Sequence, residues 1–215
     1  MILVTAASHA ESMWIPRLPD VRRLVTGMGR IAGEALARFL DGQAPSLVVG
    51  TGFCGGLSGG VAAGTVIVGQ EVDFDGERIK VDRSLVSRAE GALEAARLPF
   101  RSGRIVTTEA VVRSPKEKED LARGGAIAVD MESGLLLRAA RRAGIDFLPL
   151  RVVLDTSDKD LLFVGDRADV LRAIVHPITT LRLMQSLIIA GRAIGRAVAA
   201  IVGEFAARRG ECVAL

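Results

Sequence analysis

Asp130-Met131-Glu132-Ser133 opens the stretch of sequence that decides the fold, and Leu150-Arg151-Val152-Val153-Leu154-Asp155-Thr156-Ser157-Asp158 closes it. Apolar residues 126–129 predict a short strand, the pattern of 132–143 predicts a helix, and 147–153 predict a second strand. Such a unit normally lays its two strands parallel, so we expect both acidic groups at carboxyl edges of one sheet. Open α/β sheets bind ligands in crevices at those edges, where two carboxylates can divide the work of acid and charge stabiliser.

The rest of the chain alternates predicted strands with predicted helices. This alternation predicts an α/β fold with three α/β/α layers around a central mixed, largely parallel sheet. A length of 215 residues, of which 49% are hydrophobic, suits a single domain over residues 1–215 with one well-buried core. We expect strands at 2–5, 23–26, 46–49, 65–69, 104–107, 126–129 and 147–153, and helices at 31–40, 85–97, 115–122, 132–143 and 178–207.

Three segments do not follow this alternation simply. Residues 1–4 lack a basic start and a cleavage site, so they predict a first core strand rather than a signal peptide. The connection before Gly27 contains Pro16 and Pro19 and leaves little room for a regular helix, which predicts an irregular, partly mobile loop. Residues 181–202 are apolar, but Gln185, Arg192 and Arg196 interrupt them well before the ~20 clean residues that a membrane span needs. We therefore expect a core-packing or interface helix there and no membrane span.

Composition and charge argue against several classes of function. The net charge is +3, acids and bases are mixed, aromatic residues make up 4% and tyrosine is absent, which argues against a platform for nucleic acid. The basic clusters Arg138 with Arg141-Arg142 and Arg208-Arg209 are most simply solvated helix faces. Cys54 and Cys212 are too few and too far apart for a disulfide framework or a metal cluster. We expect a cytoplasmic protein that holds no metal.

Two glycine-rich turns allow the backbone to approach a ligand. Val48 to Leu57 runs from a predicted buried strand into Gly55 and Gly56, where the missing Cβ atoms leave backbone amides accessible. The segment lacks the Gly-Lys-Ser/Thr ending of the nucleoside triphosphatase phosphate loop and the spacing of a dinucleotide fingerprint. Gly27-Met28-Gly29-Arg30 opens the next helix, whose amino terminus suits an anion. A tight turn without a ligand is the alternative for both segments.

Together these segments resemble the nucleoside phosphorylase and nucleosidase superfamily, which contains methylthioadenosine/adenosylhomocysteine nucleosidases, purine nucleoside phosphorylases, futalosine hydrolases and hopanoid-associated nucleosidases. The resemblance covers Leu24 to Asp158 and implies a phosphorylase/hydrolase-like fold. It also implies a nucleoside ligand, no cofactor and a homo-oligomer, for which the apolar C-terminal helix argues as well. The motifs that carry it stand in the family's order at Thr26 to Arg30, Thr51 to Leu57, Gly64 to Val68, Asp130 to Ser133 and Phe147 to Asp155.

The resemblance implies roles for both acidic segments. Asp155 is expected to protonate the leaving purine at N7, Glu132 to bind the ribose hydroxyls, and Met131 to pack on the sugar. The chemistry agrees, because cleavage of an N-glycosidic bond builds positive charge on the sugar and negative charge on the base. Asp155 must then keep its proton near neutral pH, which requires a pKa raised by burial or by Asp158. In a purely structural role, Glu132 is a first-turn helix acid and Asp155 a cap.

The nucleophile is expected near the first strand. Family members that hydrolyse hold the attacking water with a glutamate, and Glu11 stands at the matching position. Two alternatives are that Glu11 is a surface residue and that His9 is the group that titrates. Bacterial hexameric-type phosphorylases bind phosphate with an arginine and a serine where this chain has Gly50 and Phe53, so the sequence favours hydrolysis. Methylthioadenosine-type nucleosidases also have a serine at the position of Phe53, so other groups such as Arg151 must help to hold the water.

The expected substrate is a purine nucleoside or a 5′-substituted adenosine. Phosphorolysis with inorganic phosphate as co-substrate is the first alternative, and a catalytically degenerate nucleoside-binding protein is the second. Val111 and Val112 stand where nucleosidases stack an aromatic residue on adenine. This apolar pocket and an abbreviated 72–81 loop indicate a bulky or hydrophobic 5′ substituent on the substrate, as in the hopanoid-associated branch. The predicted catalytic residues are Asp155 and Glu11, and the predicted substrate-binding residues are Glu132, Met131, Val112, Val111, Phe53, Cys54, Gly55 and Arg151.

Overall fold

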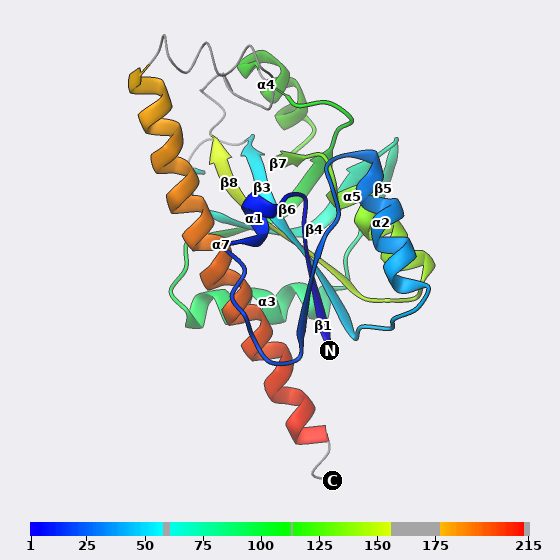
Figure 1. The fold of residues 1–215 in the computed structure, drawn as a ribbon. Coiled ribbons are helices and arrows are strands. Elements are labelled where there is room, and N and C mark those ends of the chain that lie inside the picture. The colour runs from blue at the N-terminus through cyan, green and yellow to red at the C-terminus, as the bar shows by residue number, and fades with distance from the viewer. Residues whose placement is uncertain (58–60, 113, 156–176, 213–215) are drawn as a thin grey trace.

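The strands of the chain form one mixed sheet (Figure 1). A computed structural model describes residues 1–57, 61–112, 114–155 and 177–212, with side chains except at 155, 177–183 and 208–212. The strand order is β2-β1-β3-β7-β6-β4-β5, and β8 pairs with both β3 and β4. The strands are β1 (Ile2–Ala6), β2 (Val21–Val25), β3 (Leu47–Gly56), β4 (Val66–Phe74), β5 (Glu77–Lys80), β6 (Phe100–Thr107), β7 (Ala126–Asp130) and β8 (Phe147–Asp155).

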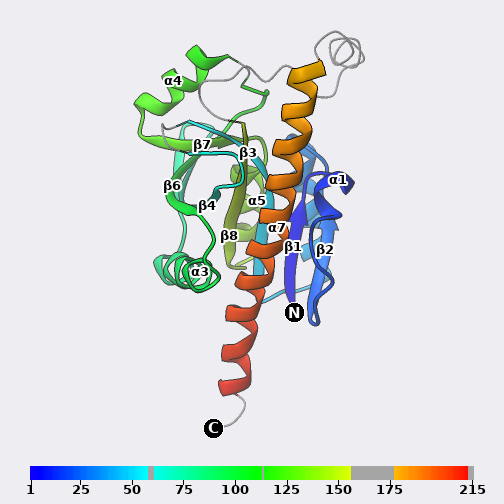
Figure 2. The same cartoon turned by 90° about the vertical axis from the view of Figure 1, so that its left-hand side faces the viewer.

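Helices cover both faces of this sheet. α2 packs with α5 on one face and α7 packs with α3 on the other, so that α5 and α7 contact β8 from opposite sides (Figure 1, Figure 2). Among the described strands, five of the eight pairings are parallel. The predicted α/β fold with a mixed, largely parallel sheet is confirmed. The helices are α1 (His9–Ser12), α2 (Arg30–Leu40), α3 (Arg83–Ala95), α4 (Pro115–Arg123), α5 (Ser133–Arg142) and α7 (Pro177–Cys212).

The two strands that decide the fold run in opposite directions. β7 is antiparallel to β3, whereas β8 is parallel to β3, so the predicted parallel arrangement of β7 and β8 is wrong. Their carboxyl ends still meet, because β3 overlaps β7 only at Gly55 and Gly56 and pairs Gly55 with Asp155 on its other side. A register shift between Cys54 and Gly55 accompanies this double pairing, and such irregularities bend a strand.

The predicted glycine-rich turn after residue 49 is the second half of β3. Its glycines serve close packing in the sheet: a Cβ atom on Gly50 would overlap the ring of Phe147 on β8. Gly52 has φ +148, which disfavours an L side chain, and a Cβ atom there would also meet neighbouring side chains. The prediction of a turn is wrong because glycines in a strand also mark places where another group comes close to the backbone.

The connection after β1 contains a short helix where the sequence predicted an irregular loop. Ser8 and Glu11 form a capping box: Ser8 Oγ accepts a hydrogen bond from the Glu11 amide at 3.2 Å, and the Glu11 carboxylate accepts one from the Ser8 amide at 3.2 Å. This reciprocal pair satisfies two amides that a helix terminus otherwise leaves free. One turn, α1, therefore forms in spite of the two prolines that follow it.

The C-terminal helix α7 is a core-packing helix, as predicted. Ile194, Val198 and Ile201 have no exposed surface, whereas Met184 and Ile189 nearer its amino end are about half exposed. Within the described residues, Met184–Ala207 is the one segment long and apolar enough to cross a membrane, and 44% of the tested window is buried inside the protein. A core helix of a soluble protein meets the same criterion, so the expected absence of a membrane span stays a prediction.

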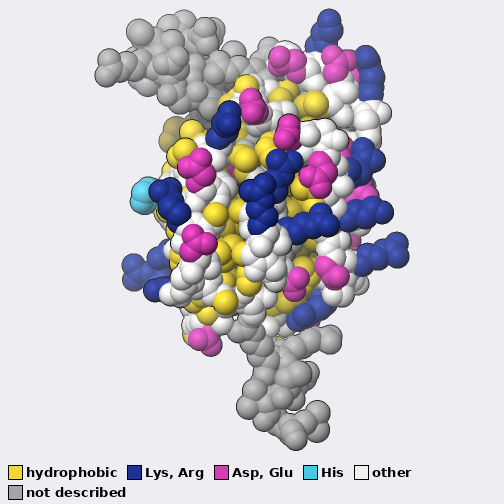
Figure 3. Space-filling model, turned by 90° about the vertical axis from the view of Figure 1, so that its right-hand side faces the viewer, with side chains coloured by type: hydrophobic (Ala, Val, Ile, Leu, Met, Phe, Trp, Pro, Cys, Tyr) yellow, Lys and Arg dark blue, Asp and Glu magenta, His cyan; other side chains and the backbone are white. Residues whose placement is uncertain are grey.

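The face that carries α2 and α5 mixes charges of both signs with apolar side chains (Figure 3). Arg141 and Arg142 are exposed, as the sequence predicted. Arg138 differs, because its guanidinium lies 4.6 Å from the centre of the Phe74 ring and pairs with Asp75 at 3.3 Å and with Glu77 at 3.4 Å. The prediction of a merely solvated cluster is therefore wrong for this residue.

Candidate functional site

A cavity of about 210 Å³ lies where the carboxyl ends of β3, β7 and β8 meet. Its walls contain eight of the ten predicted site residues, among which the two acids Glu11 and Glu132 come from segments far apart in the sequence. Arg151 lies behind the wall, and Asp155 ends the neighbouring strand β8. The eight lining residues are Glu11, Phe53, Cys54, Gly55, Val111, Val112, Met131 and Glu132.

Gly55 connects the two acidic segments of the sequence. Its backbone pairs with Val129 of β7 on one side and with Asp155 of β8 on the other. Neighbouring strands lie about 4.8 Å apart, so the backbone of Asp155 stands roughly two strand spacings from that of Val129. The side chain of Asp155 and the whole of Asp158 lie outside the described residues, and the acid role of Asp155 stays a prediction.

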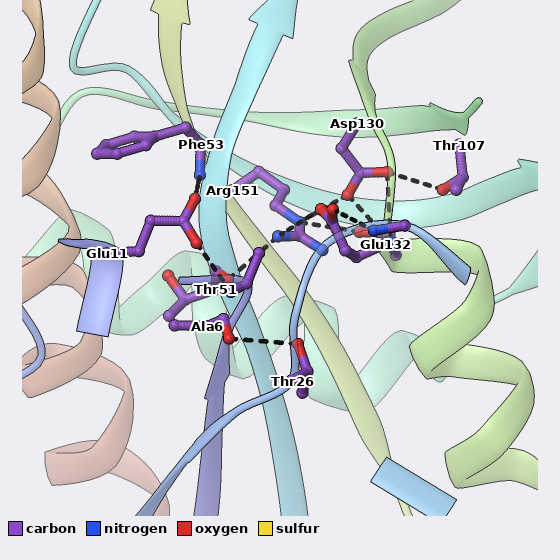
Figure 4. A network of polar contacts seen from close by, with 12 residues as sticks. Ala6, Glu11, Thr26, Thr51, Phe53, Thr107, Asp130, Glu132 and Arg151 are labelled. Atoms are coloured by element: carbon purple, nitrogen blue, oxygen red, sulfur yellow. Dashed lines mark hydrogen bonds and ion pairs between the residues drawn. The ribbon is translucent and has the colours of Figure 1, made fainter. Parts of the chain in front are cut away.

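Glu11 is a buried carboxylate held by backbone amides. Oε2 accepts hydrogen bonds from the amides of Ala7 at 2.8 Å and Ser8 at 3.2 Å, and Oε1 accepts one from the amide of Phe53 at 3.0 Å (Figure 4). The residue is only 8% exposed, so its alternative as a surface residue is wrong. His9, the alternative titrating group, is exposed.

Arg151 is the central cation of the site and is 1% exposed. Its Nε lies 2.7 Å from Asp130 Oδ2 and donates to Ser133 Oγ at 3.0 Å, while Nη1 donates to the carbonyl of Thr51 at 3.1 Å. Nη1 also stands 3.9 Å from Glu132 Oε2. Desolvation by burial lowers the pKa of Arg151, but the surrounding carboxylates outweigh it and keep the pKa above its ordinary value. The arginine is therefore charged throughout the physiological range.

Glu132 precedes the first turn of α5 and is 6% exposed. Its Oε1 accepts a hydrogen bond at 3.0 Å from the amide of Gly29, the residue just before α2, which has no side-chain cap at this end. Burial raises the pKa of Glu132, and the nearby carboxylates of Asp130 and Glu11 add to this shift, against the opposing effects of Arg151 and the Gly29 amide. The structure thus places an acid of raised pKa within the wall of the cavity.

Three residues that the sequence did not assign complete this network. Asp130 accepts hydrogen bonds from Thr107 Oγ1 at 2.8 Å and from the Ser133 amide at 3.1 Å. Gly52 leaves room for the charged groups, since a Cβ atom there would lie 2.7 Å from Arg151 Nη1 and 3.0 Å from Glu11 Oε1. Asp130 and Gly52 stand inside motifs that the sequence analysis already noticed, but Thr107 carries no signal in the sequence that points to this site.

The opposite wall of the cavity is apolar. Val111 and Val112 lie there with Cys54, Val129 and Leu154, and Phe53 is the one aromatic residue among the described lining residues. Met28, which is 60% exposed, lies at the same cavity. Three or more histidine, cysteine or acidic side chains placed to hold a metal ion are not found together anywhere in the described ranges.

A second cavity of about 420 Å³ adjoins the first, because Thr108 and Met131 line both. Its walls are more polar and include Arg30 and Asp75. A molecule larger than the first cavity therefore has room to continue past Met131.

The fold and the buried carboxyl cluster define an α/β protein with a small-molecule site at the carboxyl ends of its strands. The family model described as phosphorylase superfamily matches residues 7–178. The chain belongs to this superfamily, which confirms the resemblance seen in the sequence motifs.

Solved structures with the same fold include three well-covered relatives. The 5′-methylthioadenosine/S-adenosylhomocysteine nucleosidase of Neisseria meningitidis, in complex with methylthio-immucillin-A, is 20% identical with a TM-score of 0.74 over 94% of this chain and 97% of its own. The corresponding nucleosidase of S. pneumoniae, with a transition-state inhibitor, is 17% identical with a TM-score of 0.75 over 95% and 99%. The futalosine hydrolase of Helicobacter pylori is 15% identical with a TM-score of 0.74 over 94% and 97%.

Proposed function

We propose that this protein hydrolyses the N-glycosidic bond of a purine nucleoside or a 5′-substituted adenosine. The observation that carries the proposal is the position of Glu11, whose carboxylate is fixed by three backbone amides at the wall of the cavity that Glu132 also lines. A general base has to be held within reach of the water that it activates. Bonds to three amides hold this carboxylate more firmly than solvent would.

The charges around the cavity suit a positively charged transition state. Glu11, Asp130 and Glu132 supply three carboxyl groups around one guanidinium, that of Arg151. Cleavage of an N-glycosidic bond leaves positive charge on the ribose ring, and fixed negative groups in a buried site stabilise such charge without reorganisation. Glu132 is the residue that we assign to the ribose hydroxyls, with Met131 against the sugar.

The same arrangement favours water over phosphate as the nucleophile. The amide of Phe53 and those of Ala7 and Ser8 already donate to Glu11, so they do not serve an incoming oxyanion. An additional anion would also meet three carboxyl groups, against which one buried arginine offers limited compensation. Phosphorolysis is therefore the weaker alternative, and Arg151 is left to help orient the water.

The base is assigned to the apolar wall of the cavity. Val111 supplies contact with the purine, the backbone of Val112 reads its edge, and Cys54 and Gly55 border it. Asp155, at the end of β8 beside Gly55, is assigned as the acid that protonates the leaving base. The adjoining cavity past Met131 gives room for a substituent on the sugar, which suits a 5′-substituted nucleoside.

We expect the enzyme to work in the cytoplasm as a homo-oligomer, without a cofactor. The exposed apolar side chains Met28 and Ile31, which are 60% and 55% exposed, support self-association at the start of α2.

The test is to incubate the purified full-length chain with adenosine, inosine, 5′-methylthioadenosine, S-adenosylhomocysteine and futalosine, with and without phosphate. Chromatography then measures the free base. We expect base release from at least one substrate in phosphate-free buffer, together with free sugar rather than sugar phosphate. Strict dependence on phosphate would contradict hydrolysis, and no base release in either buffer would contradict the enzyme assignment.

A further inference from the structure

Asp130 lies at the cavity wall, where the reaction assigned above uses only its negative charge. Its side chain has no exposed surface, and both of its oxygens are engaged. Oδ1 accepts from Thr107 Oγ1 at 2.8 Å, and Oδ2 accepts from the Ser133 amide at 3.1 Å and lies 2.7 Å from Arg151 Nε. A buried carboxylate is costly unless it is paired and hydrogen-bonded, and here each bond ties it to a different part of the site.

Thr107 links Asp130 to two further elements. The two residues are register partners at the carboxyl ends of the adjacent parallel strands β6 and β7. The Thr107 hydroxyl donates to Asp130 and accepts a hydrogen bond at 2.9 Å from the amide of Gly134, in the first turn of α5. The carboxylate is thereby fixed relative to the start of α5, which also carries Glu132 just before it.

Asp130 in turn fixes the plane of the arginine. A guanidinium is planar, so bonds at two of its nitrogens determine the direction of the third. Nε is held by Asp130 and Ser133, and Nη1 by the carbonyl of Thr51, whereas Nη2 is buried and has no hydrogen-bond partner among the described residues. A buried donor of this kind gains substantially from any acceptor that a reactant brings.

We propose that Asp130, fixed by Thr107, is the positioning residue that orients Arg151 between Glu11 and Glu132 for the reaction. This inference rests on the proposed nucleosidase function. Asp130 does not touch the substrate in this role: it holds the guanidinium while Glu11 and Glu132 act on the water and the sugar. Removing the Thr107 hydroxyl loosens Asp130, and removing the Asp130 charge frees the Nε side of Arg151.

The test compares Thr107→Val, Thr107→Ser and Asp130→Asn with the wild type in the base-release assay. Thr5→Val is the matched control, because Thr5 is a fully buried strand threonine whose hydroxyl has no partner among the described residues. Circular dichroism gives the folded fraction, so that kcat is expressed per folded molecule. We expect Thr107→Val and Asp130→Asn to lower kcat by about 10- to 100-fold, the range known for loss of the outer partners that orient metal ligands.

Two further readouts separate positioning from a merely structural role. KM should stay within about twofold of the wild type, because a group that acts only in the transition state changes kcat. Thr107→Ser and Thr5→Val should keep the wild-type kcat. Asp130→Asn should also move the acidic limb of the kcat profile to lower pH, because removing the negative charge of Asp130 lowers the pKa of Glu132. The other groups that act on the pKa of Glu132 are Arg151, Glu11 and the Gly29 amide, and the substitution leaves them in place.

An active wild-type enzyme whose Thr107→Val and Asp130→Asn variants keep kcat and the pH profile would overturn the positioning role alone. A loss of rate that only follows the folded fraction would overturn it as well. Absence of base release by the wild-type protein would overturn the proposed function and this role together.

Discussion

The carboxylate of Glu11 accepts a hydrogen bond from the amide of Phe53 at 3.0 Å, although the two residues are 42 positions apart in the chain. The bond joins the short helix after β1 to the second half of β3, and it requires that Gly52 carry no side chain. It fixes the orientation of an acid at the cavity wall, and it occupies an amide that an anionic ligand would otherwise use. The predictions below follow from this bond and from its neighbours.

Replacing Glu11 should remove the base but leave a space for a small anion. We expect Glu11→Ala to lower kcat by about 10²- to 10⁴-fold, the usual contribution of a general base. Added formate should restore part of the rate, because the three freed amides offer it the same bonds. Glu34→Ala, which removes an exposed glutamate on α2, is the control and should leave kcat unchanged with or without formate. Full activity of Glu11→Ala without formate would contradict the assignment.

Replacing Glu132 by glutamine should stabilise the fold while reducing activity. The raised pKa of Glu132 means that folding favours its protonated form, so its contribution to stability is greatest below the ordinary glutamate pKa and is lost as pH rises through the raised one. Glu132→Gln should therefore have a higher Tm than the wild type at pH 7 and a similar Tm near pH 4. Calorimetry at both values measures this. A lower Tm at pH 7 would show that the ionised carboxylate stabilises the fold.

The same raised pKa predicts the acidic limit of activity. If ionised Glu132 stabilises the cationic sugar, kcat should fall as pH drops through the raised pKa, at a higher pH than an ordinary glutamate would produce. A plot of kcat against pH checks this, with protein stability measured over the same range. A rate that is constant down to pH 4 would count against the ionised role of Glu132.

Gly52→Ala should disrupt the site and the strand together. The backbone there has φ +148, and the added carbon would lie 2.7 Å from Arg151 and 3.0 Å from Glu11. We expect a loss of about 1–3 kcal/mol in the free energy of unfolding, the usual cost of a strained backbone conformation, with loss of activity. Gly91→Ala in α3, where nothing lies within 4 Å of the new carbon, should instead stabilise the protein by about 0.5–1 kcal/mol. Urea titration compares the two variants.

Asp155→Asn should separate an enzyme from a protein that only binds nucleosides. An enzyme that uses Asp155 as its acid should lose about 10²- to 10⁴-fold in kcat while keeping its fold and substrate affinity. Asp146→Asn, an exposed aspartate just before the same strand, is the control. Equal rates for the two variants would remove Asp155 from the mechanism, and isothermal titration with the substrate checks that binding persists.

Much of the secondary structure could be predicted because apolar periodicity is local. The strands near 2–5 and 147–153 and the helices near 31–40 and 85–97 appear within a few residues of their predicted limits. β5 (Glu77–Lys80) was missed because four mostly polar residues give no period to detect. The direction of β7 against β8 was mispredicted because β3, a segment remote in sequence, lies between their carboxyl ends.

By itself, the sequence determined which chemical groups we propose for the site: the acids Glu11, Glu132 and Asp155, the arginine Arg151, and their order in a superfamily pattern. Only the tertiary structure decided which partners these groups have, because backbone amides such as those of Phe53 and Gly29 occur at every position and are distinguished only by where the chain places them. The hydrogen bond between Thr107 and Asp130 likewise exists only because the fold places β6 beside β7. The pKa of Glu132 depends on burial and on charges that surround it in space, and these are properties of the fold rather than of spacing along the chain.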